Sequence, residues 1–298
     1  MPFSLLSNGS LVRQEEGDAI VPWWSFTKTV LAAAALTLVR DGLLRLDDAA
    51  LGGPFTLRQL LRHEAGLADY GELADYHAAV ARGDAPWPAQ EMLQRLDGAR
   101  LRYVPGAGWR YSNVGYMHVA QLVERVTGLA LAEALARQVL APLGLSHVRV
   151  ARTRAELDGV SMGAALSYDP GWVYHGLLVG SLTAAATLLD RLLAGHLLPH
   201  SLVQEMQAAR ALGGALAGRP WMSHGYGLGL MQGTVATGLQ LCGHSGAGPG
   251  STVAVYRGAS DAGTACCAVF HGDAVEGPAE AELVDHLGAL LNRRRPGE

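Results

Sequence analysis

The two ends of this 298-residue chain are patterned as β-strands, whereas the long stretch between them is patterned mostly as helices. Residues 3–7 and 10–15 are predicted to form a hairpin, because Asn8-Gly9 between them is a favoured turn sequence. After residue 225, four more strands joined by Gly-rich turns are predicted, at 226–232, 239–242, 251–257 and 263–271. Pairing of the two ends explains this distribution best, and the short connections predict an antiparallel sheet.

Helical periodicity dominates the remaining sequence. Residues 27–40 are Ala-rich, lack Pro and are followed by Asp41-Gly42, which predicts a helix that ends there. Further helices are predicted at 56–63, 113–128, 131–140, 183–194 and 279–293. We therefore predict an α+β fold in which the first and last helices flank the antiparallel sheet. Residues 1–45 and 222–298 would form this domain, and residues 46–221 a large all-helical insert.

Composition and charge exclude several classes of function. A net charge of −4 gives no electrostatic case for nucleic-acid binding. No stretch of about 18 apolar residues predicts a membrane span. Residues 1–10 lack the basic start and apolar segment of a signal peptide, so we expect a cytoplasmic protein.

The three cysteines, Cys242, Cys266 and Cys267, show no metal-ligand spacing, and no histidines cluster in a metal-binding pattern. Neither a disulfide nor a metal site is predicted. Cys266 and Cys267 are neighbours in a predicted strand, so they should face opposite sides of the sheet as buried, reduced thiols.

Ser25 and Lys28 begin the first predicted helix, in the sequence Ser-Phe-Thr-Lys. Residues three apart lie on one face of a helix, so the two side chains would share the same space. A serine hydroxyl becomes a nucleophile when a base lies within hydrogen-bond reach, and an uncharged lysine can be that base. Burial and the helix dipole both favour the uncharged amine. The pattern alone is weak evidence for catalysis. It is short, and a serine at the start of a helix is more often a cap than a nucleophile.

Two further motifs carry polar groups suited to catalysis. Tyr111-Ser112-Asn113 lies on a loop before a predicted helix, where a tyrosine relays protons and an asparagine hydrogen-bonds a substrate amide. His244-Ser245-Gly246 follows the predicted strand at 239–242, where Gly246 would let a substrate backbone approach.

In this order, the three motifs resemble those of the penicillin-recognising serine hydrolases, namely class C β-lactamases, D-alanyl-D-alanine carboxypeptidases and related esterases. The family signature is Ser-x-x-Lys, Tyr-x-Asn and Lys/His-x-Gly. Residues 55–67 are similar to its Leu-Leu-x-His-x-x-Gly-Leu segment, and residues 226–230 and 243–250 to its C-terminal strands. The resemblance implies a β-lactamase/transpeptidase-like fold. It also implies a serine hydrolase that cleaves an ester or amide of a small molecule through an acyl-enzyme, without metal or organic cofactor.

The resemblance assigns catalytic roles to Ser25, Lys28 and Tyr111. Ser25 would attack the acyl carbonyl, while Lys28 and Tyr111 share the proton transfers to and from the leaving group and later the water. The sequence does not say which of the two is the base in each half-reaction.

Four other residues are expected to bind the substrate. Asn113 would hold its amide or order Lys28. The backbone N–H groups of Ala247 and Ser25 would bind the oxyanion. His244, beside Gly246, would orient Tyr111 or the polar end of the substrate.

The substrate is constrained by a departure from the family pattern. His244 stands where β-lactamases carry lysine, and a histidine of ordinary pKa is mostly neutral at pH 7, which weakens the anchor for a substrate carboxylate. Small esters or amides are therefore favoured over β-lactams and D-Ala peptides. Trp23 and Trp24 are candidates for the wall of an apolar acyl pocket, with plain packing expected for at least one. His63, expected inside a helix, is interpreted as structural.

Two alternatives remain open at this stage. Gly243-His-Ser-Gly-Ala247 is close to the nucleophile elbow of an α/β-hydrolase, with Ser245 as nucleophile and His271 or His286 as partner. That elbow requires a strand followed by a helix, whereas residues 248–256 predict a turn and then a strand. The other alternative is a catalytically inactive binding protein of the same fold. The sequence does not indicate an oligomeric state.

Overall fold

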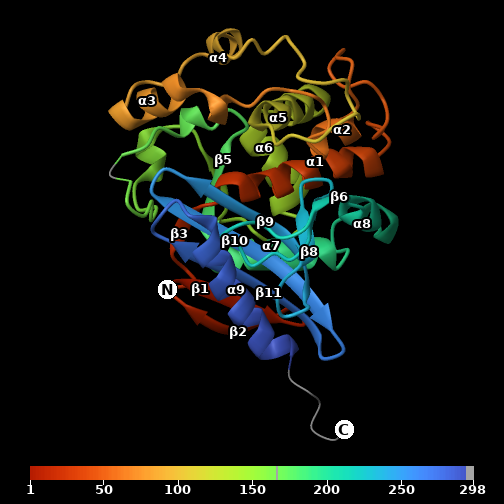
Figure 1. Ribbon diagram of the computed structural model, residues 1–298, viewed down its shortest axis with the longest axis vertical. Coiled ribbons are helices and arrows are strands. Elements are labelled where there is room, and N and C mark those ends of the chain that lie inside the picture. Colours follow the sequence, from red (N-terminus) through yellow and green to blue (C-terminus); the bar gives the residue numbers. More distant parts are fainter. Residues whose placement is uncertain (166, 293–298) are drawn as a thin grey trace, which may run out of the picture.

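An eight-stranded antiparallel sheet, built from both ends of the chain, occupies the lower half of the molecule in Figure 1. The computed structural model describes residues 1–165 and 167–292. The strand order is β2-β1-β11-β10-β9-β8-β7-β6, and β1 at the N-terminus pairs with β11, as predicted. The strands are β1 (Phe3–Ser7), β2 (Ser10–Glu15), β6 (Arg210–Gly213), β7 (His224–Tyr226), β8 (Met231–Thr234), β9 (Gln240–Gly248), β10 (Ser251–Ser260) and β11 (Gly263–His271).

The N-terminal hairpin forms around the predicted turn. Asn8 and Gly9 have φ values of 47° and 80°, the left-handed pair that matches a two-residue turn to the twist of its strands. Every residue of β2 is exposed, because β2 is the edge of the sheet.

Helices cover both faces of the sheet (Figure 1). Helix α9 (Glu276–Leu291) packs on one face against residues such as Tyr256 and Cys267. The opposite face, with Val255 and Cys266, packs into a core shared with α1 (Thr27–Arg40) and α7 (Leu182–Leu193). The adjacent cysteines therefore face opposite sides as predicted, and all three cysteines are buried and free. The first and last helices, α1 and α9, therefore flank the sheet on opposite faces, and α7 lies on the same face as α1.

The middle of the chain is not all-helical, contrary to the prediction for residues 46–221. It holds α2 (Leu57–Leu61), α3 (Ala74–Arg82), α4 (Ala89–Arg95), α5 (Asn113–Thr127), α6 (Leu131–Leu135) and α8 (His200–Gln207). It also contributes β6 to the main sheet, and β4 (Arg149–Ala151) and β5 (Leu177–Ser181) to a small sheet with β3 (Ile20–Pro22). These strands are short, and β3 pairs with β5 across most of the middle of the chain, so periodicity does not reveal them. The division at residues 45/46 and 221/222 remains a prediction.

Several predicted boundaries differ from the structure. Residues 226–232 form two strands rather than one, because Gly229, at φ 74°, turns the chain onto α1. There its carbonyl accepts a hydrogen bond of 2.7 Å from Thr29 Oγ1. Strand β9 extends through His244 to Gly248, whereas the prediction ended it at Cys242. Helix α9 begins at Glu276, three residues early, and its predicted last residue, Arg293, lies outside the described residues.

Within residues 1–165 and 167–292, none of the helices combines the length and apolarity needed to cross a membrane.

Candidate active site

Ser25 lies in a single 3₁₀ turn, Trp24–Phe26, that leads directly into α1. The N-cap residue of α1 is Phe26, and no side chain caps that end. Ser25 is therefore beside the helix start, as expected, but it is not a capping residue. Its hydroxyl instead faces the side chains of Lys28 and Tyr111, so the interpretation of Ser25 as a simple cap is wrong.

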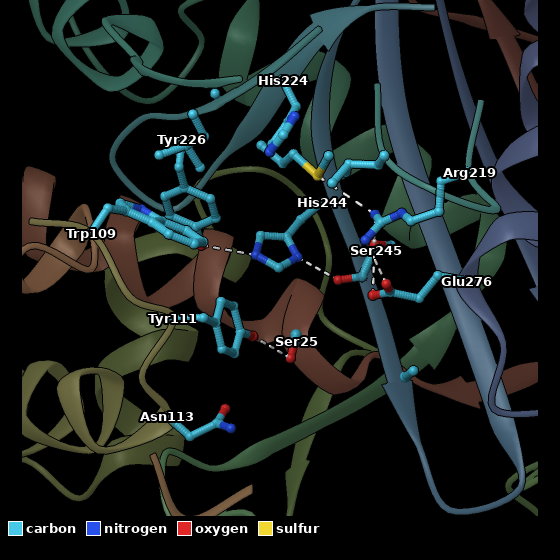
Figure 2. A pocket seen from close by; sticks show the side chains of 15 residues that line it. Ser25, Trp109, Tyr111, Asn113, Arg219, His224, Tyr226, His244, Ser245 and Glu276 are labelled. Atoms are coloured by element: carbon cyan, nitrogen blue, oxygen red, sulfur yellow. Dashed lines mark hydrogen bonds and ion pairs between the residues drawn. The ribbon is translucent and has the colours of Figure 1, made fainter. Parts of the chain in front are cut away.

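Lys28 and Tyr111 hold the Ser25 hydroxyl from two directions. Lys28 Nζ, one helical turn further along α1, lies 3.0 Å from Ser25 Oγ. The Tyr111 hydroxyl donates a hydrogen bond of 2.7 Å to the same oxygen, as Figure 2 shows. The sequence placed these three residues in one site, and the structure brings them into direct contact.

Lys28 is the only lysine in the chain, beside 22 arginines. Its side chain is fully buried, and burial lowers its pKa to about 7, although the nearby charge of Asp69 acts in the opposite direction. Arginine is not deprotonated in proteins, whereas a buried lysine titrates near neutral pH. The only lysine of the chain is thus the one beside the Ser25 hydroxyl, where an amine can accept a proton. The presence of a single lysine is a signal in the sequence that was not used in the prediction.

Tyr111 is held in its protonated form. Burial raises the pKa of its phenol well above 10. Its ring packs against that of His63 with the centroids 4.4 Å apart. Contrary to the prediction, His63 does not lie inside a helix, because α2 ends at Leu61 and His63 has a φ of 60°. Its Nδ1 accepts a hydrogen bond of 3.1 Å from the backbone N–H of Ser112, so it braces the Tyr111 loop.

Asn113 is oriented by Asp69, a residue that the sequence did not single out. The backbone N–H and side-chain Nδ2 of Asn113 donate to the two Asp69 carboxylate oxygens at 3.0 and 3.3 Å. Burial raises the pKa of Asp69, while these hydrogen bonds lower it. With Nδ2 occupied, Asn113 Oδ1 is the atom suited to accept a substrate N–H. No local sequence pattern marks Asp69, since its partner Asn113 lies 44 positions away.

His244, in β9, and Asn113 lie on opposite sides of Ser25 (Figure 2). Its Nδ1 hydrogen-bonds the Ser245 carbonyl, and its Nε2 lies 2.8 Å from the Tyr226 hydroxyl. Because a carbonyl only accepts, the proton is on Nδ1, and Tyr226 donates to Nε2. Burial lowers the pKa of His244 to about 3, so the ring is neutral. His244 thus contacts Tyr226 rather than Tyr111, and an orienting role toward the substrate stays a prediction.

Gly246 packs on the backbone of the nucleophile turn. A Cβ atom at this position would lie 2.4 Å from Ser25 N and 2.8 Å from Trp24 Cβ, which only glycine avoids. The structure thus gives Gly246 a packing role, and its predicted contact with substrate stays a prediction. Ala247, the next residue, is exposed and lines the same cavities as Ser25.

Two cavities meet at Ser25. The larger has a volume of about 440 Å³ and is also lined by Tyr111, His244, Arg219 and Glu276. The smaller has a volume of about 90 Å³, and its walls are largely aromatic. They include Trp24, Tyr70, Tyr76, Tyr168 and His175. Asn113 and Ala247 line both cavities. Trp24 thus walls a cavity, whereas Trp23 is buried in the core, which is the division expected for this pair.

Ser245 does not form a nucleophile elbow. It lies within β9, whose next element is β10, so no helix follows it. Its hydroxyl donates to Glu276 at 3.1 Å and accepts from Arg219 at 3.1 Å. His271, one of its proposed partners, hydrogen-bonds Glu282 instead. The α/β-hydrolase alternative is therefore wrong for this fold.

No group of three or more His, Cys, Asp or Glu side chains among the described residues is arranged to hold a metal ion.

The fold and the arrangement of serine, lysine and tyrosine are typical of penicillin-recognising serine hydrolases. The Beta-lactamase family model matches residues 6–287. The chain therefore belongs to the Beta-lactamase family.

Known proteins of this family include relatives of modest similarity. The chain is 28% identical to penicillin-binding protein 4* of Bacillus subtilis (strain 168) over 161 residues, which is 50% of this chain and 34% of that protein. It is 27% identical to a D-aminopeptidase of Brucella anthropi over 246 residues, or 77% of this chain and 45% of that protein. The crystal structure of D-amino acid amidase from Ochrobactrum anthropi SV3 has the same fold, with a TM-score of 0.77, 21% identity and coverage of 97% and 94% of the two chains. The chain spans less than half the length of these two curated relatives.

Proposed function

We propose that this protein is a serine hydrolase that cleaves an ester or amide bond through an acyl-enzyme on Ser25. The observation that carries the proposal is the position of Ser25 Oγ, 3.0 Å from Lys28 Nζ and 2.7 Å from the Tyr111 hydroxyl. A serine with a base at hydrogen-bond distance, and a second group that orients it, is the arrangement an activated nucleophile requires.

The protonation states support one division of the two roles that the sequence left open. Lys28, with a pKa of about 7, is partly uncharged at neutral pH and accepts the Ser25 proton as Oγ attacks the acyl carbon. Tyr111 remains protonated and donates to Oγ in the resting enzyme, so it is placed to pass a proton to the leaving group. The proton on Lys28 then returns through Tyr111, and the same pair activates water for deacylation.

The tetrahedral intermediate places a negative charge on the former carbonyl oxygen. The backbone N–H groups of Ser25 and Ala247 are the donors proposed for this oxygen, because both residues line the same two cavities. Each such donor stabilises the transition state by about 3 kcal/mol.

The leaving group is assigned to the larger cavity. Of the two cavities at Ser25, the larger is the one that Tyr111 lines, and a leaving group departs toward its proton donor. The acyl group then occupies the smaller cavity, where Asn113 Oδ1 is available to an acyl-side N–H. A volume of about 90 Å³ favours a small acyl group.

Charge in the larger cavity opposes a leaving group that carries a carboxylate. Arg219 and Glu276 line this cavity, and Arg219 also pairs with the buried Glu280, so the three side chains together carry one negative charge in excess, and His244 is neutral. A β-lactam or a peptide ending in D-Ala presents a carboxylate on the leaving-group side. Small esters and amides with neutral or cationic leaving groups are therefore the leading substrates. The relatives named D-aminopeptidase and D-amino acid amidase support an amide among them.

A fluorophosphonate probe followed by intact-mass measurement tests the proposal. We expect one adduct on the wild-type protein and on Ser245→Ala, and none on Ser25→Ala. A panel of short-chain p-nitrophenyl esters, D-amino-acid amides and a chromogenic cephalosporin then ranks the substrates. Absence of an adduct and of turnover on wild type would favour the inactive binding protein. The cytoplasmic location expected from the sequence also stays a prediction, which cell fractionation checks.

A further inference from the structure

His175 lies in the loop between the 3₁₀ turn Pro170–Trp172 and strand β5. Along the chain, this loop is distant from each of the three sequence motifs. Two hydrogen bonds fix the start of β5 to the nucleophile turn. The Leu178 N–H donates to Thr27 Oγ1 at 3.2 Å, and the Trp23 N–H donates to the Leu178 carbonyl at 2.8 Å. Because Trp23 and Thr27 flank the Ser25 turn, these bonds hold the His175 loop in register with the start of α1.

The His175 ring contacts the amine of Lys28. Nε2 of His175 lies 3.2 Å from Lys28 Nζ, and the histidine side chain is 2% exposed. Lys28 Nζ is therefore within hydrogen-bond distance of both Ser25 Oγ and His175 Nε2. His175 Nδ1 is buried without a hydrogen-bond partner among the described residues, so the hydrogen bond that this ring makes is the one to Lys28. His244, in contrast, is held by protein groups at both nitrogens.

Near neutral pH His175 is uncharged and Lys28 is partly uncharged. Burial, and then the charge of Lys28, lower the pKa of His175 well below its usual value. Other titratable groups also face Lys28. They are the rings of Tyr111 and Tyr116, at 5.0 and 5.7 Å, the carboxylate of Asp69, and the imidazoles of His63 and His244.

An uncharged amine has one lone pair and two N–H bonds, so its orientation decides whether it can act as a base. The lone pair faces Ser25 Oγ when an N–H bond points to an acceptor elsewhere. His175 with its proton on Nδ1 offers Nε2 as that acceptor. We propose that His175 is a positioning residue, whose Nε2 accepts a hydrogen bond from Lys28 Nζ and so turns the lysine lone pair toward Ser25 Oγ.

The proton balance of the reaction is unchanged by this contact. The Ser25 proton moves to Lys28 Nζ as the bond from Oγ to the acyl carbon forms, and the resulting ammonium still donates to His175 Nε2. His175 keeps its own proton throughout, so it stabilises the charged lysine without taking part in the transfer. This role rests on the proposed hydrolase function, whereas the contact between His175 and Lys28 is measurable without any turnover.

The single lysine of the chain gives a direct test. Protein labelled with ¹³Cε-lysine has one ε-carbon signal, and its chemical shift between pH 5 and 11 reports the titration of Lys28. We expect a midpoint near 7 in wild type. In His175→Phe the ammonium loses its acceptor, so the midpoint falls by about one pH unit. In His175→Gln, whose side-chain oxygen can accept, the midpoint stays close to wild type. His175→Leu is the second apolar replacement, used if the Phe variant does not fold.

Acylation kinetics measure the consequence for catalysis. The rate of Ser25 labelling by the fluorophosphonate at pH 8 should fall about 10- to 100-fold in His175→Phe and recover in part in His175→Gln. His271→Gln replaces another buried histidine, one that contacts Glu282 and not Lys28, and it should leave both the lysine titration and the labelling rate unchanged.

Two results would overturn the positioning role. One is an unchanged lysine midpoint in the apolar variants. The other is a midpoint in His175→Gln as low as in His175→Phe, which would indicate a packing effect. Failure of the hydrolase proposal is seen separately, as the absence of any adduct on Ser25 in wild type.

Discussion

The phenol of Tyr111 donates a hydrogen bond of 2.7 Å to Ser25 Oγ, although 86 positions separate the two residues in sequence. Burial keeps this phenol protonated, since it raises the pKa well above 10. A protonated phenol cannot take the serine proton. In the proposed mechanism the base is therefore Lys28, and Tyr111 is the acid for the leaving group.

Replacement of Tyr111 by phenylalanine should slow cleavage more for poor leaving groups than for good ones. Loss of a proton donor lowers kcat/KM by about 10²- to 10⁴-fold when the leaving group needs protonation. A p-nitrophenolate departs without a proton, so its ester should lose much less than an alkyl ester of the same acid. Measurement of kcat/KM for both esters with wild type and Tyr111→Phe checks this. Equal losses would assign Tyr111 to orientation of Ser25 rather than to proton donation.

The acylation rate should rise with pH through a single titration near 7. Lys28 accepts the serine proton only when uncharged, and its pKa is about 7. Acylation is thus slow below pH 6 and reaches a plateau above pH 8. Stopped-flow measurement of the p-nitrophenol burst between pH 5 and 9 gives the midpoint. The protein has no other lysine, so a burst rate that shows no midpoint near 7 within this range would exclude uncharged Lys28 as the base at neutral pH.

Replacement of Lys28 by methionine should abolish acylation and stabilise the fold at neutral pH. The folded pKa of about 7 lies below the ordinary 10.5, so between these values the unfolded chain binds more protons and the stability of wild type rises with pH. Below pH 7 the full penalty applies, at most about 5 kcal/mol, a figure that already includes the attraction to Asp69. The denaturation midpoint of Lys28→Met should thus exceed that of wild type at pH 7. The difference should shrink toward pH 10.5. A constant difference across this range would mean that the lysine is already charged in the folded state.

The sequence predicted the parts of the site that are local or carry a motif. Ser25 and Lys28 meet because a spacing of three residues at the start of a helix brings two side chains to one face. Tyr111, Asn113 and Ala247 were predicted from the order of the three motifs. Asp69 and His175 contact these residues from loops, and His175 is 147 positions from Lys28. No local pattern marks such contacts, because they arise only when the small sheet and the helical region pack together.

The fold shows the same division between local and distant interactions. The helix at 27–40 and the strand at 263–271 were predicted with their observed bounds, because periodicity and flanking turns define them locally. Strands β3, β4 and β5, of three to five residues, are stabilised by one another across the chain. Within a single short segment, their apolar residues are equally compatible with a buried helix.

Replacement of Gly246 by alanine should impair the nucleophile more than the fold. The added methyl would lie 2.4 Å from Ser25 N, so the nucleophile turn or β9 must shift. We expect a loss of about 1 to 3 kcal/mol in stability. A displacement of about 1 Å costs about 100-fold in the acylation rate. Chemical denaturation and probe labelling measure the two effects.

Gly272→Ala is the matched control for Gly246→Ala. A Cβ at Gly272 meets its nearest atom at 3.7 Å, an ordinary contact, so both stability and labelling rate should remain at wild-type levels. If Gly246→Ala labels Ser25 at the wild-type rate, the close packing of β9 on the turn does not position the nucleophile.

Replacement of Glu276 by glutamine should relax the selection against anionic leaving groups. Glu276 lies at the start of α9 and lines the larger cavity, where its carboxylate pairs with Arg219 at 2.6 Å. Removing its charge leaves Arg219 balanced by the buried Glu280 alone, so the excess negative charge of these three side chains disappears. Two esters of one acid, with an alkyl leaving group that ends in either a carboxylate or a carboxamide, isolate this effect. For the carboxylate ester, kcat/KM should rise about 5- to 10-fold relative to the carboxamide ester.

Asp285→Asn removes the same charge from an exposed position on α9 outside the cavity, so it should leave the ratio unchanged. If both variants change the ratio equally, the selection arises from net charge. If neither does, the larger cavity does not hold the leaving group, and the acyl and leaving-group sides must be exchanged.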